Sequence, residues 1–214
     1  MEQIAQTLLI SILFLSLYLL GVSSLAGCVN IVSIEGYCLG LLPLFIHEKS
    51  LTLQDFFLAL VITVLKGWLI PKVLFHAIRE VKVRHEVEPL IGYVPSLLIG
   101  TVIIATAFAL AERLPIPPGL RSSLLAPIAF ATLMMGLFMT VSRLKAVTQV
   151  VGYLVFENGI YLFGLAISYD MPWLLEIGVL LDVFVAVFIM GIMIYHISRE
   201  FDSIHTDRLT QLRD

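Results

Sequence analysis

Residues 147–169 read VTQVVGYLVFENGIYLFGLAISY, an apolar run with one charged residue, Glu157, near its middle. A helix of roughly 20 apolar residues is needed to cross the hydrocarbon core of a bilayer, which is about 30 Å thick. This run meets that length. We therefore predict a transmembrane helix that carries an acid inside the membrane.

The same apolar pattern recurs along the whole chain. Its 214 residues are 59% hydrophobic and 14% charged, whereas a soluble domain has about 25% charged residues. Polar clusters separate the predicted spans, which are 4–26, 28–47, 53–78, 90–111, 122–142, 147–169 and 173–197. The predicted fold class is all-α, a polytopic transmembrane bundle of about seven helices.

The distribution of Lys and Arg predicts the orientation, because these residues accumulate in cytoplasmic loops. One set of alternate loops holds three of them, Lys49, Arg113 and Arg121. The other set holds eight, which are Arg79, Lys82, Arg84, Arg143, Lys145, Arg199, Arg208 and Arg213. We expect the N-terminus outside and the tail, 199–214, in the cytoplasm. The net charge of −3 and the lack of a basic block argue against nucleic acid as a partner.

An internal repeat is suggested by two matching segments. Residues 75–80 (FHAIRE) and 195–200 (YHISRE) match at an offset of 120. Parallel repeats of this kind are related about an axis along the membrane normal. The division this predicts is a three-helix unit, a linker with a fourth helix, a second three-helix module and the tail, at 1–80, 81–120, 121–198 and 199–214.

Four charged residues lie deep in the predicted spans: Glu35, Lys66, Glu157 and Asp182. Each costs about 2.5–3.5 kcal/mol at mid-membrane even on a lenient insertion scale. Such residues mark ion or proton pathways, so we interpret the set as a proton pathway. Glu157 is the clearest member, because Tyr153 and Tyr161 continue a polar stripe along its helix face and Asn158 lies beside it.

Lys66 precedes Gly67 and Pro71, and a proline at that spacing frees the carbonyl of residue 67 and bends the helix. Broken helices of this kind line cavities. We expect Asp182 as the carboxylate partner of Lys66. Two alternatives stay open: a permanently protonated Glu157 that bonds to a neighbouring helix, and a Lys66 to Asp182 ion pair that only fixes packing. The residues leave the role of Glu35 undecided.

No nucleophile elbow, phosphate-binding loop, zinc motif or cysteine cluster is visible in the sequence. The two cysteines, Cys28 and Cys38, are ten residues apart on one apolar run and are interpreted as packing residues. The sequence thus predicts a chain with no cofactor, metal or redox centre of its own.

Three motifs resemble the hydrogenase-4 component E family, a membrane subunit of group 4 nickel–iron (NiFe) hydrogenase complexes. They are residues 66–71 (KGWLIP), residues 152–159 (GYLVFENG) and residues 176–182 (EIGVLLD). The last three predicted helices are also similar to subunit K of complex I and to its counterpart in multisubunit cation/proton antiporters. This resemblance implies that Glu157 and Asp182 lie on a proton route. The family's usual acid at the second position is Glu, and here it is Asp182.

The resemblance further implies a non-catalytic subunit in a bacterial or archaeal cytoplasmic membrane. Its partners would be antiporter-like and subunit-H-like membrane proteins, together with soluble hydrogenase-type subunits that hold the nickel–iron centre and iron–sulfur clusters. The other functions that the sequence allows are a component of a cation/proton antiporter, a stand-alone secondary transporter and a structural membrane anchor.

Overall fold

The computed structural model describes residues 2–46, 53–80, 90–113, 124–167 and 191. Every element within these ranges is helical, as predicted. The elements are α1 (Glu2–Gly21), α2 (Leu25–Leu41), α3 (Pro43–Ile46), α4 (Leu53–Ile62), the π-helix η1 (Thr63–Leu69), α5 (Ile70–Glu80), α6 (Tyr93–Ala111), α8 (Leu125–Ser142) and α9 (Ala146–Ile167).

Six helices within the described ranges are long and apolar enough to cross a membrane. They correspond to the first six predicted spans, so the chain is an all-helical protein suited to a multi-pass membrane position. The seventh predicted span, 173–197, and the tail, 199–214, lie outside the described residues. So does Asp182.

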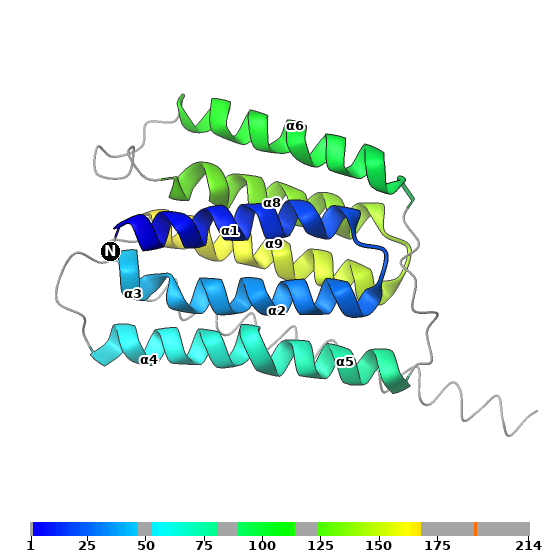
Figure 1. Cartoon of the computed structure of the whole chain (residues 1–214), viewed down its shortest axis with the longest axis horizontal. Helices are drawn as coiled ribbons and strands as arrows, with labels where there is room; N and C mark the ends of the chain where they lie inside the picture. The colour runs from blue at the N-terminus through cyan, green and yellow to red at the C-terminus, as the bar shows by residue number, and fades with distance from the viewer. Residues whose placement is uncertain (1, 47–52, 81–89, 114–123, 168–190, 192–214) are drawn as a thin grey trace, which may run out of the picture.

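Four helices form the centre of the bundle. α1 packs on α2, α2 on α9, α9 on α8 and α8 on α1. α6 packs on α1 and α8, while α4, η1 and α5 cover the opposite flank on α2, so that these elements lie at the two sides of the bundle in Figure 1. In that view the hairpin of α8 and α9 runs in the same sense as the hairpin of α1 and α2.

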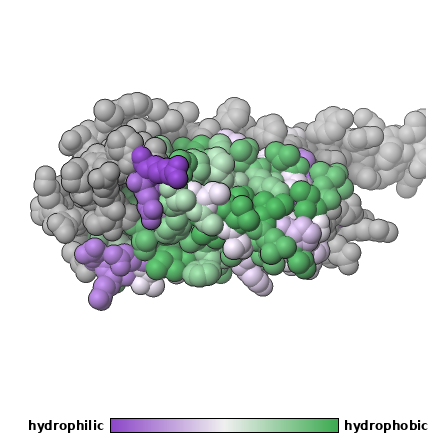
Figure 2. Space-filling view, turned by 90° about the horizontal axis from the view of Figure 1, so that it is seen from above, coloured by the Kyte–Doolittle hydropathy of each residue, from purple (hydrophilic) through white to green (hydrophobic). Residues whose placement is uncertain are grey.

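Large apolar side chains point outward from the bundle. Phe14, Phe57, Leu98 and Val102 are each at least 62% exposed. Figure 2 shows hydrophobic residues over most of the coloured part of one face, with hydrophilic residues gathered near its ends. Because a soluble protein avoids large contiguous apolar patches, this surface suits a lipid environment.

The first break in the chain was predicted near Gly27, and this position was wrong. α1 ends at Gly21 and α2 begins at Leu25. The Ser24 side chain caps α2 by accepting a hydrogen bond from the Gly27 N–H (3.1 Å). A serine at this position satisfies an N–H group that the helix start leaves without a partner, which places Gly27 inside the first turn.

Glycines bring α8 and α9 into backbone contact. A Cβ on Gly152 would lie 2.6 Å from the Thr140 backbone nitrogen. A Cβ on Gly136 would collide with the Phe156 backbone, and one on Gly159 with the Leu133 backbone. Small residues allow this close approach, which drives helix association in membranes through van der Waals packing. The central helix α9 is thereby held firmly at its polar middle.

Gly159→Ala should lower the free energy of unfolding by about 1–3 kcal/mol, because the added methyl group overpacks the α8–α9 contact. Gly164→Ala is the matched control on the same helix, since a Cβ there meets no described atom within 4 Å. The control should be neutral or should raise stability by up to about 1 kcal/mol through helix propensity. Thermal unfolding in detergent micelles measures both, and equal effects of the two changes would contradict this packing.

Candidate functional site

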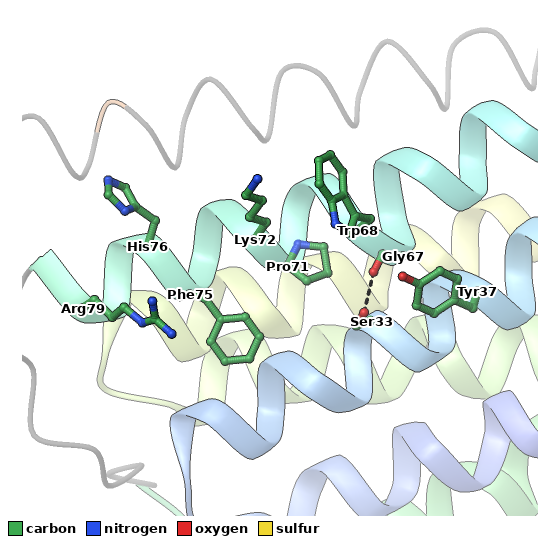
Figure 3. Close-up of a pocket in the computed structure, with 9 residues that line it drawn as sticks. All are labelled: Ser33, Tyr37, Gly67, Trp68, Pro71, Lys72, Phe75, His76 and Arg79. Carbon is green, nitrogen blue, oxygen red and sulfur yellow. Dashed lines mark hydrogen bonds between the residues drawn. The ribbon is translucent and has the colours of Figure 1, made fainter.

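The site begins with the local backbone around Pro71. Proline has no N–H group, so the Gly67 carbonyl loses its usual helical partner. The chain adapts by forming η1, in which the Ile70 N–H bonds to the Leu65 carbonyl, five residues back. The Ser33 hydroxyl of α2 donates to the Gly67 carbonyl (Figure 3). The prediction of a broken helix is therefore wrong. The helix continues through Pro71, because the π-helix and the Ser33 hydroxyl provide hydrogen bonds for the backbone around the proline.

The π-helix lies directly against α2. A Cβ on Gly36 would lie 2.5 Å from the carbonyl carbon and oxygen of Lys66, and one on Gly40 would collide with Thr63. Two glycines one turn apart thus form a flat surface on which η1 rests. Because Glu35 is next to Gly36, this contact brings the acid of α2 close to the lysine of η1.

A buried polar network joins four helices. The Lys66 Nζ lies 4.0 Å from the Glu157 Oε2 and donates to the Asn158 Oδ1 (3.2 Å). The Asn158 Nδ2 donates to the Glu35 Oε2 (3.1 Å). The Ser16 Oγ lies 2.8 Å from the Glu35 Oε1. The network therefore connects α1, α2, η1 and α9.

The members of this network are withdrawn from the surface. The exposed fraction is 0% for Glu35, 6% for Lys66, 2% for Glu157 and 2% for Asn158. An isolated charge in such surroundings is very costly, whereas opposite charges at contact distance with additional hydrogen bonds offset much of that cost. The charges therefore depend on one another. When one member gains or loses a proton, the electrostatic energy of the others changes.

The structure brings Glu35, Lys66, Glu157 and Asn158 together. The partner predicted for Lys66, Asp182, lies outside the described residues. Within the described part of the chain, Lys66 contacts Glu157 and Asn158. Glu35, whose role the sequence left undecided, is bonded to this group.

The two tyrosines of the predicted stripe differ. Tyr161 is buried in the core, while Tyr153 is half-buried and its ring centroid lies 6.1 Å from that of Phe156.

Ser16 was missed by the sequence reasoning. It is 1% exposed, and its hydroxyl lies 3.0 Å from the Ile12 carbonyl of its own helix as well as close to Glu35. The only signal in the sequence was a single polar residue among apolar ones at 12–20. That signal is weak, because a serine in a membrane helix commonly bonds back to its own backbone.

Arg143 was predicted to lie in a loop, and it does lie between α8 and α9, but its side chain is buried. It is 1% exposed, and its Nη2 donates to the Leu20 carbonyl near the end of α1 (2.7 Å). Its guanidinium carbon lies 5.7 Å from the centroid of the Tyr93 ring. A cation at a helix C-terminus is favourable because the last carbonyls carry partial negative charge. Burial lowers the pKa of this guanidinium, but an arginine remains protonated at physiological pH.

A groove of about 500 Å³ is lined by residues of α2, η1 and α5 (Figure 3). Its lining residues are Ser33, Tyr37, Gly67, Trp68, Pro71, Lys72, Phe75, His76 and Arg79. The Lys72 Nζ lies 4.5 Å from the centroid of the Trp68 ring. Ser33 and Gly67 line this groove, and the hydrogen bond between them also supports the π-helix. Among the described residues no group of three or more His, Cys, Asp or Glu side chains could hold a metal ion.

Comparison with known proteins gives a distant relationship. The chain is 29% identical over 192 residues to an uncharacterized protein of Mycobacterium tuberculosis, covering 89% of this chain and 87% of that protein. It is 28% identical over 150 residues to hydrogenase-4 component E of Escherichia coli K12, covering 69% and 68%. The protein of the same name in Shigella flexneri gives the same values. No family model matches the chain. No solved structure matches it.

Ser16→Ala should lower the free energy of unfolding by about 1–3 kcal/mol, because it removes a hydrogen-bond partner from a fully buried carboxyl group. Ser11→Ala is the matched control on α1, where the hydroxyl donates to the Thr7 carbonyl (2.8 Å) and lies near the outer face. The control should change stability by less than about 0.5 kcal/mol. Unfolding in detergent compares the two, and a neutral Ser16→Ala would show that this hydroxyl does not support Glu35.

Proposed function

We propose that this chain is a non-catalytic membrane subunit of a complex-I-like, group 4 hydrogenase assembly, and that its buried acids take part in proton translocation. The observation that supports this most directly is the Lys66 to Glu157 pair inside the bundle, 4.0 Å apart. The distant homology to hydrogenase-4 component E supplies the class of complex.

The chemistry of the pair suits a group that changes its protonation. With Glu157 ionised, the pair is neutral and Lys66 also bonds to Asn158. With Glu157 protonated, the Lys66 ammonium group interacts with the remaining acceptors of the network. A movement that changes the separation of Lys66 from Glu157 therefore changes the proton affinity of the acid, because an opposite charge within about 4–6 Å favours the ionised form.

In this proposal the chain itself performs no redox chemistry. The nickel–iron centre and the iron–sulfur clusters belong to soluble partner proteins, and antiporter-like and subunit-H-like proteins flank it in the membrane. We propose that Glu157 and Asp182 lie on the proton route, as the resemblance of the motifs implies. The cytoplasmic orientation of the C-terminus and a bacterial or archaeal cytoplasmic membrane are part of the same proposal. It retains the division into units 1–80, 81–120 and 121–198.

A second candidate function, a structural membrane anchor, is favoured by the hydrogen bonds of Asn158 and Glu35. Asn158 bonds through both ends of its amide, and each carboxylate oxygen of Glu35 has a donor. Networks of this kind can serve only to fix helix packing. The two functions differ in their response to neutral, isosteric replacements, since an anchor keeps its packing while a proton pathway loses its carrier.

Glu157→Gln should abolish proton translocation while the complex remains assembled and its electron transfer continues, because an amide retains the shape but not the titratable proton. Proton uptake into vesicles that contain the whole complex, with its assembly checked on native gels, measures this. Glu112→Gln is the matched control, since Glu112 is exposed at the end of α6 and should be silent.

Full coupling in Glu157→Gln would contradict the proton-pathway role and favour the anchor. Ion transport by the purified chain alone, reconstituted without partners, would instead favour a stand-alone transporter. Genes for antiporter components beside its own, without hydrogenase genes, would favour an antiporter complex.

A further inference from the structure

We propose that Glu35 is a second proton-carrying acid of this site, and that Glu35 and Glu157 share one proton across Lys66, with Asn158 as the positioning residue that couples them. This inference deepens the proposed function and rests on it. It also gives a role to a residue that the sequence motifs left without one.

The surroundings of Glu35 accommodate both of its protonation states. As a carboxylate it accepts from the Ser16 hydroxyl at Oε1 and from the Asn158 amide at Oε2. The Ser16 oxygen has one proton and two neighbouring acceptors, the Glu35 Oε1 at 2.8 Å and the Ile12 carbonyl at 3.0 Å. When Glu35 is protonated at Oε1, it donates to Ser16, and Ser16 donates to Ile12. Both states therefore give the carboxyl and hydroxyl oxygens hydrogen-bond partners.

Among the described residues, the charges of this network sum to one negative charge in excess. Two acids, Glu35 and Glu157, face one cation, Lys66, and all three are at most 6% exposed. A net charge in such surroundings is far more costly than a neutral group. One proton held by either acid makes the trio neutral while Lys66 stays protonated. When one acid releases it and the other binds it, one O–H bond breaks, another forms, and the total charge is unchanged.

Other charged residues within the described ranges do not alter this count. Arg143 is the remaining charged residue among those buried there, and its guanidinium bonds to the Leu20 carbonyl and faces Tyr93. It interacts electrostatically with Cys28 on α2, which is seven residues and hence about 10 Å along the helix from Glu35. Cys38 also lies on α2, but a thiol is neutral at physiological pH.

Asn158 links the two acids through Lys66. Its Oδ1 accepts from Lys66 and its Nδ2 donates to Glu35, so a shift of Lys66 toward Glu157 pulls on the contact that holds Glu35. An amide carries no exchangeable charge, which makes it a positioning group and not a proton carrier. The coupling is therefore reciprocal: protonation of one acid favours the ionised form of the other.

Infrared difference spectroscopy on the full chain in lipid bilayers tests this, since it counts protonated carboxyl groups by their C=O stretch. Relative to the wild type, Glu35→Gln and Glu157→Gln should each remove one protonated carboxyl. The double variant should also remove only one, because each single change leaves one acid ionised against Lys66. Lys66→Met should add one, and Glu112→Gln should change nothing.

Independent acids would give a different pattern. Either one single variant would be silent, or the double variant would lose two carboxyls, and both results would overturn the sharing of one proton. Glutamine has nearly the shape of glutamate, so the decisive single and double variants should keep the fold. The conclusion does not depend on whether Lys66→Met folds.

Asn158→Leu tests the positioning role with a side chain of similar size. Once the amide is gone, Glu35 no longer senses Lys66 and should hold its own proton, so adding Glu157→Gln should leave one protonated carboxyl where Glu157→Gln alone leaves none of this pair. If Asn158 were purely structural, its replacement would not change the number of protonated carboxyls that Glu157→Gln leaves.

This spectroscopic pattern is independent of proton pumping. Unimpaired pumping in Glu157→Gln would therefore overturn the proposed function, whereas an additive loss of carboxyls in the double variant would overturn only the sharing of one proton.

Discussion

The burial of Lys66 is the constraint on which the middle of the bundle depends. An ammonium group that is 6% exposed needs compensating charge and hydrogen bonds, because in a low-dielectric interior its hydration is lost. Glu157 and Asn158 of α9 supply them from one side. Glu35 extends the compensation to α2 and, through Ser16, to α1. The need to compensate the charge of one buried lysine thus constrains which helices contact one another and at which point along their length.

Close backbone packing makes this compensation geometrically accessible. Gly36 and Gly40 let the π-helix rest on α2, while glycines of α8 and α9 hold α9 in place on the other side. The π-helix is itself a response to Pro71, with Ser33 supplying a donor to the Gly67 carbonyl. π-helical turns are rare in proteins, and those that occur are often found at functional sites. They change which residues of a helix face a neighbour. Here the turn contains the residue that carries the charge.

The sharing of one proton that we propose requires the network to accommodate two distributions of its protons, with Ser16 hydrogen-bonded in both. An ion pair that only joins two helices would not have this property. A membrane protein without a redox centre can contribute to energy conversion in this way, because moving a charge by a few ångströms in a low-dielectric interior changes the affinity of nearby acids strongly. The distant relationship to hydrogenase-4 component E suggests a membrane subunit of a complex-I-like hydrogenase.

The sequence by itself determined that the chain is helical, which six described stretches are long and apolar enough to span a membrane, and that Glu35, Lys66 and Glu157 lie inside them. These are local properties, since about 20 apolar residues are what a bilayer demands of any helix.

Only the tertiary structure decided which partners those residues have. Asn158 is 92 residues from Lys66 in sequence and 123 from Glu35, and no local pattern encodes contacts across such distances. The sequence did not reveal the contacts of Ser16 and Arg143 for the same reason, because the neighbours that bury them come from other helices. Hydropathy reports where a segment lies, whereas the pairing of buried charges depends on how helices pack.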